Sequence, residues 1–240
     1  MVGSSARVLR LAFRWLTRQE AIVLLVAFGV ILALLVFAKT AGEMLEGDLG
    51  EFDEGLLRYL RDPNDPRKPI GPPWLVAVST DVTALGGTTV LVIVLVIVVG
   101  YLALEHRYAE VLLIAVAASV GGALSEILKL WFDRARPDVV PHLVSVASAS
   151  FPSGHSMLAV VTYLTLGALM ARFATRRRLR TYCIGVSLVL ALVIGVTRVY
   201  LGVHYPTDVL AGWSAGLAWA LLWWLVARAL QYRGQVKTGG

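Results

Sequence analysis

Residues 151–173 read FPSGHSMLAVVTYLTLGALMARF, a short polar start followed by a long apolar run. An α-helix rises about 1.5 Å per residue, so about 20 residues cross the hydrocarbon core of a membrane, which is about 30 Å thick. The run from 154 to 173 has this length. Five more stretches share its length and apolar character, so the sequence predicts membrane spans at 21–38, 86–104, 110–131, 154–173, 182–200 and 209–228.

The composition also indicates a membrane protein. Of the 240 residues, 58% are hydrophobic and 16% are charged, and the mean hydropathy is +0.73. A backbone in lipid must satisfy its own hydrogen bonds, and continuous apolar runs lack the alternation of a transmembrane barrel. The sequence therefore predicts an all-α membrane protein, a six-transmembrane-helix bundle that forms one domain over residues 21–230.

Lysine and arginine gather in three parts of the chain, around 7–18, 172–180 and 228–237. If six helices alternate in direction, all three parts lie on one side of the membrane, and the positive-inside rule makes that side the cytoplasm. Membrane orientation thereby explains the net charge of +6, and no nucleic-acid partner is expected. We expect a protein of the bacterial plasma (inner) membrane with both termini in the cytoplasm.

The two ends and the first outer loop carry patterns of their own. Residues 1–20 are expected to form a cytoplasmic segment whose arginines recur at helical spacing, typical of an amphipathic helix on the headgroup layer or of an extension of the first span. Residues 231–240 are expected to form a cytoplasmic tail. In the loop at 39–73, apolar residues recur along one side of a helix before the first proline, which predicts a short interfacial helix.

Three groups of polar residues stand at the ends of predicted spans: KLWFDRARP at 129–137, FPSGH at 151–155 and RVYLGVHYPTD at 198–208. Alternating helices place all three on the extracytoplasmic side. Ionisable residues near membrane depth are costly, which makes them candidates for function. We therefore expect one site, facing the periplasm or the cell exterior, at the outer ends of four helices.

The cations in these groups suit a phosphate. An arginine fork grips phosphate oxygens in pairs, and a lysine supplies a mobile point charge, so Lys129, Arg136 and Arg198 are candidates for binding a phosphoryl group. Ser153 and Gly154 open a predicted helix, where free backbone N–H groups favour an anion. The sequence therefore predicts a phosphate-binding cavity.

Two histidines and an aspartate complete the candidate site. His155 follows the predicted anion cradle and is a candidate general acid. His204 stands four residues before Asp208, and a carboxylate that binds one ring nitrogen leaves the other as a nucleophile. These three residues could also bind zinc, but the three cations would repel a divalent ion. No metal and no cofactor are expected.

Two charged residues beside these groups are given no catalytic role. Arg134 is expected to reach the lipid headgroups. Glu126 lies one turn before Lys129 in a predicted helix and is expected to pair with it.

In order and spacing, the three groups resemble the signature of the type 2 phosphatidic acid phosphatase superfamily. That signature is Lys, six residues, Arg-Pro; then Pro-Ser-Gly-His; then Ser-Arg, five residues, His, three residues, Asp. The match covers residues 129–208. The sequence departs from it at Thr197, where the family usually has serine and where the hydroxyl is retained.

The resemblance implies a metal-independent membrane enzyme that hydrolyses lipid phosphates. His204 would attack phosphorus to give a phosphohistidine, oriented by Asp208, and His155 would protonate the leaving lipid oxygen. The phosphate would be held by Lys129, Arg136, Ser153, Gly154 and Arg198.

The expected partners are a lipid phosphate substrate and the surrounding membrane lipids. Undecaprenyl diphosphate, hydrolysed to undecaprenyl phosphate, is the first choice of substrate. Phosphatidylglycerophosphate, phosphatidate and lipid A phosphate are the alternatives. A lipid phosphotransferase and a non-catalytic lipid-phosphate binder or transporter are the competing functions, and the binder is disfavoured because both histidines and Asp208 are present.

Overall fold

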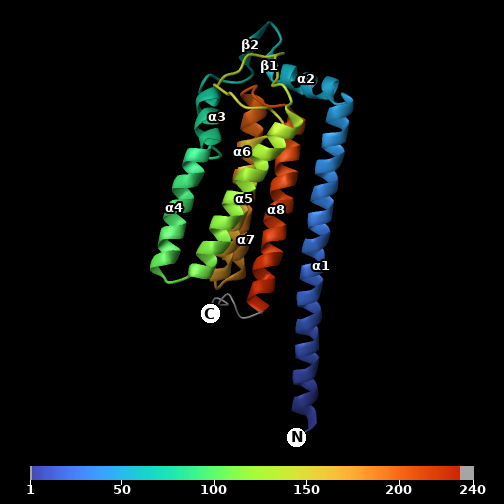
Figure 1. Ribbon diagram of the computed structural model, residues 1–240, viewed down its shortest axis with the longest axis vertical. Coiled ribbons are helices and arrows are strands. Elements are labelled where there is room, and N and C mark those ends of the chain that lie inside the picture. The colour runs from blue at the N-terminus through green and yellow to red at the C-terminus, as the bar shows by residue number, and fades with distance from the viewer. Residues whose placement is uncertain (1, 233–240) are drawn as a thin grey trace.

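The computed structural model describes the backbone of residues 2–232 and the side chains of residues 20–231. Within this range the regular secondary structure is helical apart from one small hairpin (Figure 1), and residues 133–153 form a long loop between two helices. The all-α class is confirmed. The elements, in chain order, are α1 (Val2–Glu46), α2 (Gly50–Tyr59), β1 (Arg61–Asp62), β2 (Asp65–Pro69), α3 (Trp74–Ala84), α4 (Thr88–Leu104), α5 (Tyr108–Phe132), α6 (Gly154–Phe173), α7 (Arg177–Tyr200) and α8 (Pro206–Tyr232).

Five helices in the described part of the chain are long and apolar enough to cross a membrane: Glu20–Glu46 within α1, Tyr108–Phe132, Gly154–Phe173, Arg177–Tyr200 and Pro206–Gln231. Helices α3 and α4 meet the same test together, with a bend of 47° at the break between them. The sequence pattern predicts only α4, because polar residues at 79–83 interrupt the apolar run of α3. The described residues therefore contain five candidate spans, or six if the bent pair is one span.

Figure 1 shows α2, β1 and β2 at one end of the bundle and the end of α8 at the other, where α1 projects beyond the other helices. The cytoplasmic position of the termini follows from the charge bias and stays a prediction. The amphipathic character of residues 1–20 and the tail at 231–240 fall almost wholly outside the described side chains.

The loop at 39–73 contains the short helix that its pattern predicts. This helix, α2, exposes Phe52, Leu56 and Tyr59 and buries Asp53 and Leu57. Leu57 packs with three buried residues of the bundle: Val140, Val199 and Val209. The antiparallel hairpin of β1 and β2 follows α2 and was not predicted. That α2 lies at a membrane interface stays a prediction.

Helix α6 is the centre of the bundle and packs against α5, α7 and α8. Its contact with α8 is close because α8 carries glycine there. A Cβ atom at Gly212 would lie 2.6 Å from the Ser153 carbonyl oxygen, and one at Gly216 would lie 2.7 Å from that of Met157. This packing fixes the start of α6 against the start of α8, which brings the second and third polar groups together.

Candidate active site

The three polar groups line one cavity of about 350 Å³ at the α2 end of the bundle. Lys129 comes from α5, Arg136 from the loop after it, His155 from the first turn of α6, and Arg198 from the end of α7. The cavity is also lined by Gly154 and His204. The structure therefore brings together the cations and both histidines that the sequence analysis selected.

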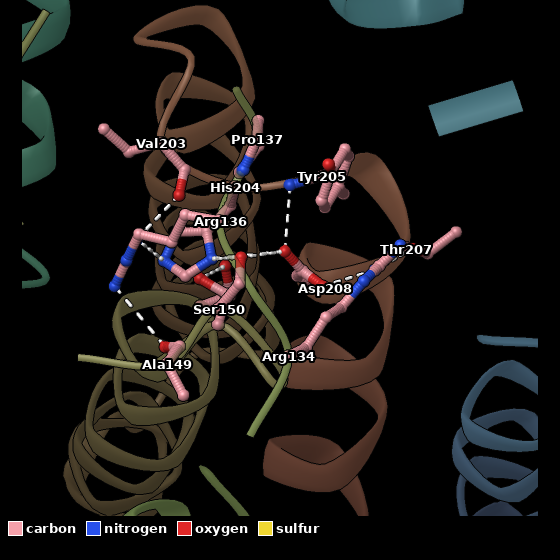
Figure 2. A network of polar contacts seen from close by, with 12 residues as sticks. Arg134, Arg136, Pro137, Ala149, Ser150, Val203, His204, Tyr205, Thr207 and Asp208 are labelled. Atoms are coloured by element: carbon pink, nitrogen blue, oxygen red, sulfur yellow. Dashed lines mark hydrogen bonds and ion pairs between the residues drawn. The ribbon is translucent and has the colours of Figure 1, made fainter. Parts of the chain in front are cut away.

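The contacts of His204 decide which of its ring nitrogens carries the proton. Nη1 of Arg136 lies 3.2 Å from Nε2 of His204, and a guanidinium group can only donate, so Nε2 accepts. The proton then lies on Nδ1, which faces Ser150 Oγ at 3.3 Å and Asp208 Oδ2 at 3.5 Å. Figure 2 shows Arg136 on one side of the His204 ring and Asp208 on the other.

The environment of His204 favours the neutral imidazole. The pKa of His204 is lowered to about 4, chiefly by burial. The hydrogen bond and charge of Asp208 act to raise this pKa, and the charges of Arg136 and Arg198 act to lower it. At neutral pH the ring therefore keeps a lone pair on Nε2.

Ser150 is a site residue that the sequence analysis missed. Ser150 is fully buried, and its Oγ donates to Asp208 Oδ2 at 2.5 Å. The lone pairs of this oxygen can then accept from Nδ1–H of His204. Because the direct distance from Nδ1 to Asp208 is long for a hydrogen bond, the serine shares in orienting the ring. The signal was present: Ser148 and Ser150 stand two residues apart just before FPSGH, and in extended chain such residues point to one side.

Arg134 does not reach the headgroups as expected, and that prediction was wrong. Its guanidinium lies between two buried carboxylates, with Nη1 donating to Asp208 at 2.6 Å and Nη2 donating to Asp53 at 2.8 Å. It also stacks over the Tyr205 ring, 4.2 Å from the centroid. Burial lowers its pKa, but Asp208 and Asp53 outweigh burial and raise the pKa above the ordinary value. Arg134 therefore stays charged beside Asp208.

The three candidate phosphate-binding cations line the cavity. Arg198 is buried and donates from Nη1 to Thr83 at 3.3 Å, but among the described residues nothing accepts from its Nε. Lys129 Nζ contacts Glu126 at 3.1 Å and Ser148 at 3.4 Å. A buried N–H without an acceptor is costly, so the Arg198 Nε suits an anionic ligand.

Arg136 is held in place by carbonyl groups. Its Nε donates to Ser148 O at 2.7 Å and its Nη1 to Val203 O at 2.6 Å. Burial lowers the pKa of Arg136 below its ordinary value, although the charge of Asp208 acts in the opposite direction. Because carbonyls rather than carboxylates hold this guanidinium, its positive charge is not neutralised by the contacts that fix it.

In the FPSGH segment, Gly154 and Ser153 differ in their surroundings. A Cβ atom at Gly154 would lie 2.9 Å from Lys129 Nζ, so only glycine leaves room for that ammonium group. Ser153 is less available than expected, because its N–H donates to the Asp208 carbonyl and its Oγ accepts from Ser156. The phosphate contact predicted for Ser153 stays a prediction.

The break between α3 and α4 forms a further wall of the cavity, which the sequence analysis did not predict. Gly86 and Thr88 line it. A Cβ atom at Gly86 would lie 2.5 Å from Cγ2 of Ile194 and 3.4 Å from the His155 carbonyl oxygen, and one at Gly87 would lie 3.8 Å from the Nε2 of His155. The break therefore lies beside the candidate general acid, and Gly86 lets it pack against Ile194 of α7. Among the described residues, no group of three or more His, Cys, Asp or Glu side chains could hold a metal ion.

Comparison with known proteins identifies the family. The PAP2 superfamily model matches residues 110–232, which contain all three polar groups. The chain belongs to the PAP2 superfamily. Phosphatidylglycerophosphatase B of Bacillus subtilis (strain 168) is 38% identical over 157 residues, 64% of this chain and 74% of that protein.

Two further relatives of this PAP2 protein bear on its function. The crystal structure of a transmembrane PAP2-type phosphatidylglycerolphosphate phosphatase from Bacillus subtilis matches with a TM-score of 0.77 at 29% identity, over 85% of this chain and 98% of that one. A protein of Escherichia coli (strain K12) named as an undecaprenyl-diphosphatase, YbjG, is 28% identical over 169 residues, 69% of this chain and 80% of that protein. The PAP2 protein described here is a membrane lipid phosphatase, as its sequence predicts.

Proposed function

We propose that this PAP2 phosphatase transfers the terminal phosphate of a lipid phosphate to Nε2 of His204 and then to water. The observation that carries the proposal is the hydrogen bonding of His204, in which Nε2 carries no proton and accepts from Arg136 at the cavity, while Nδ1–H is directed toward Ser150 and Asp208. A neutral imidazole with its second nitrogen oriented by a carboxylate is the arrangement of an activated nucleophile.

The reaction proceeds in two steps. In the first, Nε2 of His204 forms a bond to phosphorus, the bond from phosphorus to the lipid oxygen breaks, and His155 gives its proton to that oxygen. In the second, a water molecule attacks phosphorus, its proton passes to His155, and the N–P bond breaks to release inorganic phosphate. Lys129, Arg136 and Arg198 offset the charge that spreads over the phosphoryl oxygens in both steps.

Phosphatidylglycerophosphate is the substrate that we propose first. The Bacillus subtilis relatives, in sequence and in structure, carry that activity in their names. Glu126 adds a physical reason, since its carboxylate lines the cavity beside Lys129 and would repel a second phosphate bonded directly to the first. Undecaprenyl diphosphate, which the sequence analysis put first, is the second candidate and is favoured by the likeness to YbjG.

We propose that the cavity faces the periplasm or the cell exterior. The arginine-rich α6–α7 turn supports this orientation, because it lies at the opposite end of the bundle from the cavity. A membrane-impermeant thiol reagent tests it on intact cells with Ser145→Cys at the cavity in a Cys183→Ser background. Labelling without membrane disruption is expected, and labelling only after disruption would reverse the orientation.

The mechanism is tested by phosphate release from a panel of lipid phosphates in detergent with excess chelator. His204→Ala and His155→Ala are compared with the wild type, and His106→Ala, at the exposed α4–α5 turn, is the matched control. We expect His204→Ala to lose about 10³-fold or more in kcat, and the wild type to trap acid-labile phosphate on histidine. Undiminished release in His204→Ala would refute the nucleophile, and loss of release with chelator would refute the metal-independent mechanism.

A further inference from the structure

Asp53 is a buried carboxylate that lies outside the three polar groups and outside the residues matched to the family model. It comes from α2, and its side chain is fully buried. Its carboxylate accepts three hydrogen bonds, two from Thr207 (backbone N–H at 3.1 Å and Oγ1 at 2.5 Å) and one from Arg134 Nη2 at 2.8 Å. A carboxylate so completely bound in the interior is costly to bury and therefore needs a reason.

The contacts of Asp53 converge on the residue next to Asp208. Thr207 is the second residue of α8, and its N–H is one of the groups at a helix start that has no partner within the helix. Asp53 accepts from that N–H and so caps α8 from a different helix. The direction in which α8 begins, and with it the position of Asp208, is thereby fixed by α2.

Arg134 makes the second connection. One guanidinium nitrogen donates to Asp53 and the other to Asp208 Oδ1, while Asp208 Oδ2 faces Ser150 and His204. One cation is thus shared between two buried carboxylates. If the charge of Asp53 were removed, Arg134 would be attracted to Asp208 alone, and less of the Asp208 charge would be available to Nδ1 of His204.

Docking of α2 alone does not account for Asp53. Leu57, one turn further along α2, is fully buried and already packs against Val140, Val199 and Val209. Buried ion pairs contribute little net stability compared with apolar packing. The geometry therefore connects the buried charge to catalysis more directly than to the attachment of the helix.

We propose that Asp53 is a positioning residue for catalysis: through Arg134 and Thr207 it sets the orientation of Asp208 and the share of negative charge that Asp208 presents to His204. The inference rests on the proposed role of His204 as the nucleophile. It makes α2 a contributor to the active site, in addition to the three polar groups and the break between α3 and α4.

The test is steady-state kinetics of Asp53→Asn, which keeps the shape of the side chain and removes its charge. Glu54→Gln is the matched control, because Glu54 is the neighbouring acid on α2 and pairs with Arg58 at the exposed surface. We expect kcat per folded enzyme to fall about 10-fold in Asp53→Asn, as for residues that orient a reacting group through a neighbour, with KM changed less than about twofold. Glu54→Gln should match the wild type in both.

A double-mutant cycle with Arg134→Gln separates positioning from a merely structural contact. If Asp53 acts through Arg134, Asp53→Asn should lower kcat by less than about twofold in the Arg134→Gln background. An unchanged kcat in Asp53→Asn, a rise in KM alone, or a second full 10-fold loss in the double variant would overturn the proposal.

Two further arms keep the result interpretable. If Asp53→Asn cannot be purified as a folded protein, Thr207→Val takes its place, since it removes the hydroxyl that donates to Asp53 and accepts from Arg134 Nη1, and Arg134 and Thr207 are the two groups through which Asp53 acts. A lower kcat at unchanged KM supports the proposal, and an unchanged kcat overturns it. His204→Ala is assayed in parallel. Full activity in His204→Ala would refute the proposed function itself, whereas inactive His204→Ala with unchanged Asp53→Asn would refute only the positioning role.

Discussion

Nη1 of Arg136 lies 3.2 Å from Nε2 of His204, and the same nitrogen donates to the Val203 carbonyl at 2.6 Å. The arginine thus identifies the basic nitrogen of the ring, because a guanidinium group only donates. It also places a positive charge beside the atom that would receive the phosphoryl group. The positive charge keeps His204 neutral in the absence of substrate, because a second proton on the ring would lie next to a fixed cation.

The first prediction concerns the titration of His204. Burial lowers its pKa to about 4, with Asp208 opposing and Arg136 and Arg198 assisting the shift. A phosphomonoester substrate itself titrates near pH 6, so activity alone would confuse the two groups. We therefore expect the imidazole resonances that are absent from His204→Ala to titrate near pH 4 in the ¹⁵N spectrum of the wild type.

The same shift has a consequence for stability. The pKa of His204 in the folded protein is below the unfolded value of about 6.5, so the unfolded chain takes up the proton first as pH falls. The contribution of neutral His204 to stability is complete above pH 6.5 and is lost as pH falls toward 4. The melting temperature should drop more steeply over this window in the wild type than in His204→Ala, and equal slopes would contradict the lowered pKa.

The sequence predicts which side chains line the cavity better than it predicts the hydrogen bonds that hold them. Apolar spans of fixed length put the cavity-lining side chains at one level of the membrane, so they could be placed together: Lys129, Arg136, His155, Arg198 and His204. The residues that were missed act across long separations in the chain. Arg134 joins Asp208 and Asp53, which stand 74 and 81 positions away from it, and no local pattern encodes such a pairing.

The bent pair α3 and α4 shows a second limit. Polar residues near the end of α3 weaken its apolar signal, and they do so for a reason: Thr83 faces Arg198, and the following glycines face His155. A helix that lines an active site departs from the pattern of one that only crosses lipid. The polar residues of α3 were therefore a sign of function. A hydropathy scan alone interprets them as the lack of a membrane-spanning helix.

The second prediction concerns Ser150, which lies between Asp208 and Nδ1 of His204 (Figure 2). Ser150→Ala removes a hydrogen bond to the buried carboxylate and the oxygen that faces the ring. We expect kcat to fall about 10-fold at nearly constant KM, because the phosphate-binding cations are untouched. Ser187→Ala, which removes only a hydroxyl bonded to a carbonyl within α7, is the control in the same assay. A Ser150→Ala enzyme with the wild-type kcat would show that Asp208 orients His204 unaided.

The third prediction concerns the space beneath Lys129. In Gly154→Ala the new methyl group would lie 2.9 Å from Nζ and 3.2 Å from Cε of Lys129, so the ammonium group must shift from its observed position. We expect kcat/KM to fall at least about 10-fold, because a misplaced cation no longer meets the developing charge. Gly122→Ala in α5 is the matched control, since a Cβ atom there meets nothing within 4 Å. Similar kinetics for the two variants would show that Lys129 does not bind the phosphate from its observed position.

The fourth prediction concerns the choice between a phosphomonoester and a diphosphate. Glu126 lies at the cavity with its carboxylate 3.1 Å from Lys129 Nζ, and its side chain is 65% exposed. In a diphosphate the second phosphorus follows the first across a single oxygen, so its charge would come close to this carboxylate. In phosphatidylglycerophosphate a glycerol separates the two phosphates. Glu126→Gln should therefore raise kcat/KM for undecaprenyl diphosphate relative to phosphatidylglycerophosphate by about threefold, a modest factor because water screens an exposed charge.

The ratio of the two kcat/KM values is the quantity to measure, because it cancels differences in the amount of active enzyme. Glu54→Gln removes a partly exposed carboxylate charge from α2, outside the lining of the cavity, and should leave the ratio at the wild-type value. Raising the salt concentration should shrink the difference between Glu126→Gln and the wild type, since the repulsion acts through solvent. A ratio unchanged by Glu126→Gln at low salt would mean that this carboxylate does not select the substrate, and the preference for a monoester would then rest on the relatives alone.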